Sequence, residues 1–97
     1  MENFRQNIQN TIELCNIEIE NRNIGIEGES SIEQLEGIIL PELKTVVEQL
    51  KKNQLPARET RFLNSFANAF TVWGWDMQEP TELFLALNQL NNQYKEL

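Results

Sequence analysis

The sequence predicts an all-α protein, folded as a compact antiparallel four-helix bundle. Apolar residues recur at steps of three and four along four stretches of the chain, which is the spacing of one face of an α-helix. Short polar connections that contain glycine or proline separate these stretches, and no stretch shows the alternation of a β-strand. The length of 97 residues suits a single helical domain over 1–97.

The first helix is expected over about 3–22. Its main apolar side chains fall inside a stripe about 80° wide; they are Phe4, Ile8, Ile12, Cys15 and Ile19. Leu14 and Ile17 lie off this stripe, which leaves a second contact possible on that side. Two glycines, at 25 and 28, then end the helical pattern.

The second helix is expected over about 31–53. Ser30 and Glu33 have the spacing of a capping box, in which each side chain accepts a main-chain N–H of the other residue. The apolar face continues on both sides of Pro41, although proline removes one helical hydrogen bond and disfavours α geometry at the residue before it. We therefore predict one helix kinked at Pro41, with two separate helices as the alternative.

Two further helices are expected over about 57–73 and 80–96. The helix over 57–73 is apolar around more than half of its circumference, which is typical of a central helix, and Gly74 is placed to end it. The last helix begins at Pro80 and has a narrow apolar seam. The residues of this seam are Leu83, Leu87, Leu90, Tyr94 and Leu97.

The charge is unevenly distributed along the chain. The net charge is −7, and residues 1–40 contain eight Glu against two Arg, whereas residues 41–97 are nearly balanced. Proteins bind nucleic acids and anionic membranes largely through Lys and Arg. The composition therefore argues against both as partners.

Seven of the carboxylates lie within 24 residues and are opposed by a single Arg. They are Glu13, Glu18, Glu20, Glu27, Glu29, Glu33 and Glu36. Antiparallel packing of the first two helices would gather them at one end of the bundle. We interpret this end as a docking surface for a basic protein, with Glu27, Glu29, Glu33 and Glu36 as the candidate binding residues. A solvated face that aids solubility is the alternative, and weak divalent-cation binding is a third.

The residues for catalysis or metal binding are scarce. The absence of histidine removes the usual general base and the commonest metal ligand. One Cys and one Asp cannot build a structural zinc site or an EF-hand loop, and four scattered glycines form no phosphate loop. Cys15 lies in the apolar stripe of the first helix, where a free thiol behaves as a small core side chain. We expect no enzyme, no cofactor and no metal site.

Aromatic and basic residues form two further groups. The stripe of Phe62, Phe66, Phe70 and Trp73 is expected in the core, with a ligand groove as the alternative. Trp75 follows Gly74 and can be an exposed interface anchor or fold back to close the bundle end. Four basic residues surround the turn between the second and third helices, at the end opposite the acidic group; they are Lys51, Lys52, Arg58 and Arg61. This group can complement a helix C-terminus or bind a phosphate.

The first ten residues lack the apolar segment of a signal peptide, and no stretch approaches the roughly 20 apolar residues of a membrane span, so a cytoplasmic location is expected. In size, charge and helical class the chain is similar to the colicin-type immunity proteins, which block basic nuclease toxins, although no motif matches residue by residue. This resemblance implies a basic protein as the partner.

The leading hypothesis is a non-enzymatic protein-binding module that docks a basic protein through its acidic end. It could be an inhibitor, an immunity or antitoxin protein, or an adaptor. Ile24, Ile26 and Trp75 are the candidate apolar anchors. One alternative is a self-associating structural subunit that uses Leu14, Ile17, Leu85 or the seam of the last helix. Another is a helical protein that binds a small ligand or an anion.

Overall fold

The computed structural model describes residues 2–97, and its first element is α1, Glu2–Asn23. This helix agrees with the prediction of about 3–22. Phe4, Ile8 and Cys15 of the predicted stripe are buried, and the other two stripe residues pack partly against the same core. Leu14 also packs against the core, whereas Ile17 is exposed. After α1 the chain turns through Gly25, whose φ of +90° is a conformation that glycine adopts without strain.

The second helical run is continuous over 32–52 and contains three segments. They are α2, Ile32–Gln34; η1, a π-helical turn over Leu35–Ile39; and α3, Leu40–Lys52. The helix therefore continues through Pro41, as predicted, and the distortion takes the form of a widened turn just before the proline. Within it, the N–H of Leu40 donates to the carbonyl of Leu35, five residues back. Such turns are a recognised way to accommodate a residue that interrupts the α-helical ladder.

The predicted helix over 57–73 is wrong in its first half. The chain instead forms η2, a 3₁₀ turn over Arg58–Thr60, then extended backbone at Arg61 and Leu63, and then α4, Asn64–Thr71. The apolar periodicity does not reveal that main-chain N–H groups in this segment donate hydrogen bonds to side chains of other helices. Asn91 Oδ1 accepts from the N–H of Leu63 (2.8 Å), so a polar side chain of the last helix replaces a helical hydrogen bond.

The last helix is α5, Glu82–Glu96. It begins two residues later than predicted, because Thr81 is its N-cap and accepts from the N–H of Phe84 at 3.1 Å. The seam of this helix is buried except for Leu97, which packs against the core from its edge. The seam therefore packs against other elements of the same chain.

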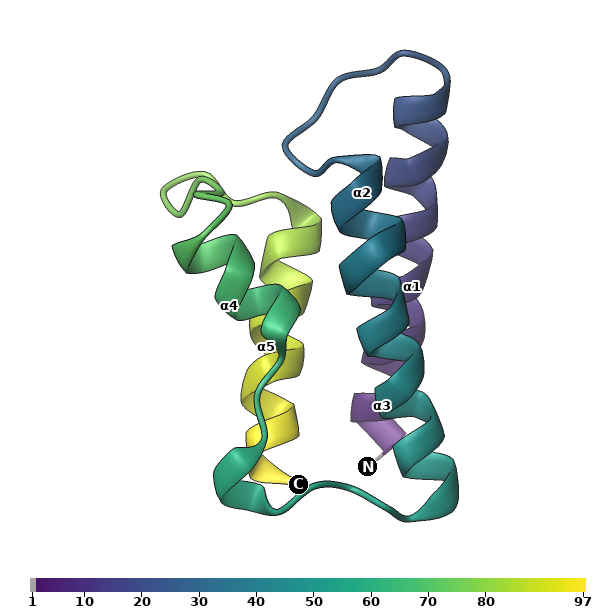
Figure 1. The fold of residues 1–97 in the computed structure, drawn as a ribbon, viewed down its shortest axis with the longest axis vertical. Coiled ribbons are helices and arrows are strands. Elements are labelled where there is room, and N and C mark those ends of the chain that lie inside the picture. The colour runs from purple at the N-terminus through teal and green to yellow at the C-terminus, as the bar shows by residue number, and fades with distance from the viewer. Residues whose placement is uncertain (1) are drawn as a thin grey trace.

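Figure 1 shows that successive helices run in opposite directions, so the loop between α1 and α2 and the turn between α4 and α5 lie at one end of the molecule. The connection from α3 to α4 lies at the other end. α1 packs against both α3 and α5, and α4 packs against α5. The described residues, 2–97, form no strand. The prediction of an all-α fold is confirmed, with four main helices.

Candidate functional site

Most of the predicted acidic group lies at the end where the α1–α2 loop and the α4–α5 turn meet (Figure 1), but Glu13 lies in the middle of α1 and is not part of it. A hydrogen bond joins these two segments, because Glu29 Oε2 accepts from the main-chain N–H of Asp76 at 2.7 Å. The turn adds Asp76 and Glu79 to the group, which the charge count along the first helices did not reveal. We call this surface the acidic end. It is defined by Glu27, Glu29, Glu33, Glu36, Asp76 and Glu79, all of which are exposed.

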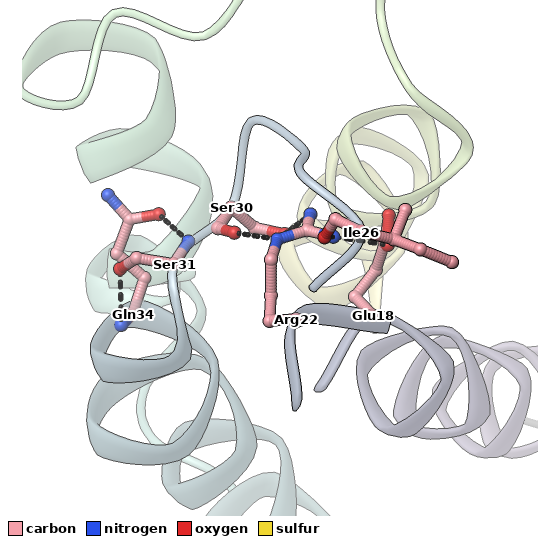
Figure 2. A network of polar contacts seen from close by, with 6 residues as sticks. All are labelled: Glu18, Arg22, Ile26, Ser30, Ser31 and Gln34. Atoms are coloured by element: carbon pink, nitrogen blue, oxygen red, sulfur yellow. Dashed lines mark hydrogen bonds and ion pairs between the residues drawn. The ribbon is translucent and has the colours of Figure 1, made fainter. Parts of the chain in front are cut away.

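Arg22 fixes the loop that carries the first of these carboxylates, as Figure 2 shows. Its Nε donates to the carbonyl of Ser30 at 2.7 Å, and Nη2 donates to the Ser30 hydroxyl at 3.1 Å. Nη1 donates to the carbonyl of Ile26 at 3.3 Å and lies 3.4 Å from the carboxylate of Glu18. The single Arg of the region is therefore engaged inside the loop, so it does not cover the exposed carboxylates.

Gly28 makes room for this arrangement. A β-carbon at Gly28 would overlap the guanidinium of Arg22, so any other residue would displace the side chain that organises the loop. The position of Arg22 inside the loop thus depends on a residue that the sequence suggested only as a helix breaker.

The helix that follows the loop begins with a capping box one residue later than predicted. Ser31 is the N-cap, and its hydroxyl accepts from the N–H of Gln34 at 3.1 Å while Gln34 Oε1 accepts from the N–H of Ser31 at 3.0 Å (Figure 2). Ser30 is buried against Arg22 instead. Because Gln34 takes the role predicted for Glu33, the carboxylate of Glu33 stays exposed at the acidic end.

The carboxylates have few intramolecular partners. Within residues 2–97, Glu18 is the only one of the seven predicted carboxylates in an ion pair. A shallow hollow of about 460 Å³ lies between Arg22, the loop and the first turn of α2. The exposed apolar side chains Ile24, Ile26 and Met77 border this end.

Trp75 does not belong to this surface, and its role as an exposed anchor is wrong. Only 4% of its area is exposed, and its ring packs edge-on against Phe84 at a centroid distance of 5.6 Å. Trp75 folds back onto the bundle, which is the other arrangement that the sequence allowed. Its indole Nε1 is buried and has no hydrogen-bond partner among the described residues.

The aromatic stripe is also placed differently from the expectation. Phe62 and Phe70 are 51% and 47% exposed, whereas Phe66 and Trp73 are partly buried and pack against the core, so only half of the stripe reaches the core. The short α4 explains this difference. Phe62 precedes the helix and lies between two residues with extended backbone, Arg61 and Leu63. Among the helices, α4 makes its main contacts with α5 only.

The basic residues lie at the opposite end, as predicted, but two of them are engaged. Arg58 donates through Nη2 to the main-chain oxygens of Glu96 and Leu97, at 3.2 and 2.9 Å. Arg61 donates to the carbonyl of Pro56 at 2.7 Å and to that of Leu97 at 2.5 Å. Both therefore complement the last turn of α5. Lys51 and Lys52 remain exposed in the last turn of α3.

The chemistry of the described residues is limited. Cys15 is fully buried, and burial, with a smaller effect of Glu18, raises the pKa of its thiol to about 12. In residues 2–97, no three His, Cys, Asp or Glu side chains lie where they could hold a metal ion. None of the helices described there is long and apolar enough to cross a membrane.

Comparisons with protein-family models, with characterised proteins and with solved structures gave no match.

Proposed function

We propose that this chain is a non-enzymatic protein-binding module that docks a basic protein partner at the acidic end. The observation that supports this most is the fixed loop. Arg22 holds the main chain at Ile26 and Ser30, and Glu29 ties the loop to the α4–α5 turn. A loop already ordered before binding loses little conformational entropy on association.

The composition of the acidic end supports a basic protein as the partner. Exposed carboxylates attract Lys and Arg and increase the rate of encounter. Ile24, Ile26 and Met77 add exposed apolar area beside these charges, and buried apolar contacts provide most of the affinity at the centre of a protein interface. A free cation would use only the charges, so the apolar side chains favour a protein.

Catalysis is not part of the proposal. The thiol of Cys15 is buried and neutral at ordinary pH, which makes it a poor nucleophile. A reduced cysteine in the core is compatible with a reducing compartment, and we place the protein in the cytoplasm as part of this proposal. An inhibitor, an immunity or antitoxin protein, and an adaptor all fit this description.

The proposal is tested by affinity capture from the host lysate with three baits. The first is the wild-type chain. The second has Glu27, Glu33 and Glu36 changed to Gln, which removes exposed charge and leaves the Glu29 tie intact. The third has Glu13, Glu48 and Glu59 changed to Gln, which alters the net charge equally but lies outside the acidic end. Bound proteins are eluted in salt steps and identified by mass spectrometry.

We expect a basic protein to bind the first and third baits in stoichiometric amount and to elute at moderate salt. The second bait should lose it. With the purified partner, the Gln variant should bind more weakly and with a smaller dependence of affinity on salt concentration. Equal affinity and equal salt dependence for the second and third baits would contradict the proposal.

A further inference from the structure

A hollow of about 360 Å³ separates α3 from the segment that connects it to α4. One face of α3 forms the first wall, and residues of the segment 56–64 form the second. Tyr94 of α5 lies at the floor, because only 4% of its area is exposed. We call this site the polar hollow and define it by Thr45, Gln49, Thr60, Phe62, Asn64 and Tyr94.

The polar hollow exists because the chain is not α-helical over 57–63, although its apolar spacing favours a helix there. Glu42 Oε2 accepts from the N–H of Asn64 at 2.7 Å, and Asn91 Oδ1 accepts from the N–H of Leu63 at 2.8 Å. These bonds hold the second wall apart from α3. A segment in which the fold overrides the local preference is often a functional one. Walls that are fixed in advance also lower the entropic cost of binding.

The polar hollow offers a ligand no free charge. Glu42 is the only charged residue among the described ones that line it, and both of its carboxylate oxygens accept from N–H or hydroxyl groups of α4. Arg61 donates to main-chain oxygens of Pro56 and Leu97. Burial raises the pKa of Tyr94, whereas Arg61 lowers it and Glu42 raises it, so the two charges have opposite effects at the floor. A charged ligand would therefore be desolvated without a counter-ion.

Three hydroxyl groups of the polar hollow already donate their protons within the chain. Thr45 and Thr60 donate to main-chain carbonyls at 3.0 and 2.9 Å, and Tyr94 donates to Gln49 Oε1 at 3.0 Å. Each of these oxygens can therefore only accept a hydrogen bond from a ligand. A ligand that fits must bring several donors to one small site.

Two amides and one aromatic ring complete the polar hollow. Within residues 2–97, neither Gln49 Nε2 nor the side-chain amide of Asn64 has a hydrogen-bond partner. The Nε2 group can only donate, so the ligand needs acceptors as well as donors. Phe62 is 51% exposed at the edge of the site and provides an apolar surface.

From these observations we propose that the polar hollow binds an uncharged polyhydroxylated ring, which is the chemistry of a neutral monosaccharide. Every hydroxyl of such a ring both donates and accepts, so it matches the oxygens of Thr45, Thr60 and Tyr94 and the two amides. The C–H groups on one face of the ring can pack against Phe62. Small-molecule sites have volumes of about 300–1,000 Å³. The polar hollow lies near the lower limit, which suits a single ring.

The first test titrates the isotope-labelled full chain with glucose, galactose and mannose at millimolar concentrations and follows the amide resonances by NMR. We expect at least one of these sugars to shift the resonances of Thr45, Thr60 and Asn64 in a saturable way, with a dissociation constant in the millimolar range. The absence of saturable shifts with all three sugars, or shifts confined to other parts of the chain, would overturn the proposal.

The second test examines the charge of the ligand. The sugar that binds best is replaced by its 2-amino analogue, which is a cation, and by its uronic acid, which is an anion. Each should bind about tenfold more weakly, because the added charge has no free counter-ion in the polar hollow. If either analogue binds as tightly as the neutral sugar or more tightly, the assignment of an uncharged ligand is wrong.

The third test uses matched variants. Thr45→Val removes an acceptor and keeps the shape of the side chain, and Phe62→Ala removes the aromatic surface. Each should raise the dissociation constant by about three- to tenfold. Phe70→Ala is the control, because Phe70 is 47% exposed, close to the value for Phe62, and does not line this site. Circular dichroism shows that each variant folds. Equal effects of Phe62→Ala and Phe70→Ala would contradict the proposal.

These tests are independent of the acidic end. The variant with Glu27, Glu33 and Glu36 changed to Gln should bind the sugar as the wild type does, because these residues do not line the polar hollow. A failure to bind sugar leaves the proposal of a basic protein partner unaffected, and the reverse also holds.

Discussion

At the scale of single residues, Arg22 has the largest set of polar contacts at the acidic end. We expect Arg22→Ala to lower the free energy of unfolding by about 2 kcal/mol, because three hydrogen bonds from a charged donor are lost and the carbonyl of Ser30 loses its partner. Urea unfolding measures this change. Lys44→Ala, at an exposed cation of α3, is the control and should change stability by less than about 0.5 kcal/mol.

Gly28→Ala provides an independent check on Arg22. The added β-carbon would displace the guanidinium, so this substitution should lower stability by the same mechanism. The loss in the free energy of unfolding of the double variant, with Arg22→Ala and Gly28→Ala combined, should then be clearly smaller than the sum of the two single losses. If the two losses in the free energy of unfolding simply add, Gly28→Ala does not act by displacing the guanidinium of Arg22.

Cys15 makes a prediction about pH. Its folded-state pKa is raised from 9.0 to about 12, so above pH 9 the unfolded chain loses a proton that the folded chain keeps. Stability should therefore be unaffected by this thiol below pH 9 and fall as the pH rises from about 9 toward 12. Burial also raises the pKa of Tyr94, which acts in the same direction. Cys15→Ala should flatten the decline without removing it.

Thiol labelling gives a second measurement on the same residue. Native protein at neutral pH should react with a maleimide much more slowly than protein unfolded in guanidinium, because the thiolate is the reactive form and the side chain is buried. Labelling at the rate of an exposed cysteine would show that α1 opens locally around Cys15.

At the scale of elements, α4 depends on side chains from other helices for its N-terminus. The side chain of its N-cap residue, Leu63, accepts no hydrogen bond from the first turn of the helix. Glu42 of α3 instead accepts from the N–H groups of Asn64 and Ser65, at 2.7 and 2.8 Å, and from the Ser65 hydroxyl. A carboxylate at a helix N-terminus also interacts favourably with the helix dipole.

Glu42→Gln should therefore destabilise the protein by about 1–2 kcal/mol, because the amide provides one acceptor oxygen where the carboxylate provides two. Chemical denaturation measures this change. Glu48→Gln, on the same helix, is the matched control. Its ion pair with Lys51 is exposed and should contribute less than about 1 kcal/mol. Equal effects of the two substitutions would contradict the cap assigned to Glu42.

Glu42 and Asn91 also show where sequence reasoning fails on this fold. The bounds of α1 and the continuity of the helix through Pro41 follow from local periodicity, and both were predicted. The break before α4 was missed, because Leu63, Asn64 and Ser65 donate to residues that are distant in the sequence. Local patterns contain no information about such partners, so the apolar stretch predicts an α-helix over 57–63, where the chain instead forms a 3₁₀ turn followed by extended backbone.

The candidate site follows the same rule. The placement of Glu27 and Glu29 at one end depends only on antiparallel helices, which loop length indicates. The burial of Trp75 and the exposure of Phe70 depend on where the short α4 rests against α5. Aromatic spacing indicates that an apolar surface exists, but which side faces solvent is determined by tertiary packing.

At the scale of the whole molecule, the chain is electrically polar along its long dimension. The acidic end collects exposed carboxylates from two segments that are distant in the sequence. At the other end, Arg58 and Arg61 are held at the last turn of α5, and the exposed Lys51 and Lys52 lie at the same end of the molecule, in the last turn of α3. Such a distribution orients an approaching charged partner before contact. It also means that the folded state brings like charges together at one end.

This repulsion gives a prediction that separates a functional surface from a solvated one. Glu27, Glu33 and Glu36 are exposed, and no ion-pair partner lies beside them in the part of the chain that the structure describes. Changing all three to Gln should raise the free energy of unfolding by a few tenths of a kcal/mol, with the largest gain at low salt, because we expect the like-charge repulsion that is removed to outweigh the favourable interaction of Glu33 with the dipole at the start of α2. Thermal melts across a series of salt concentrations measure the gain.

Glu29→Gln is the contrasting variant, because this carboxylate accepts from the N–H of Asp76 and its loss weakens the contact between the two loops. We expect it to lower stability or leave it unchanged. If the triple variant is more stable and also fails to bind the basic partner, the three carboxylates are present at a cost to the fold, as binding residues often are. If the triple variant is less stable than the wild type, the three charges stabilise the fold itself. That result would contradict the proposal that these carboxylates are present for binding.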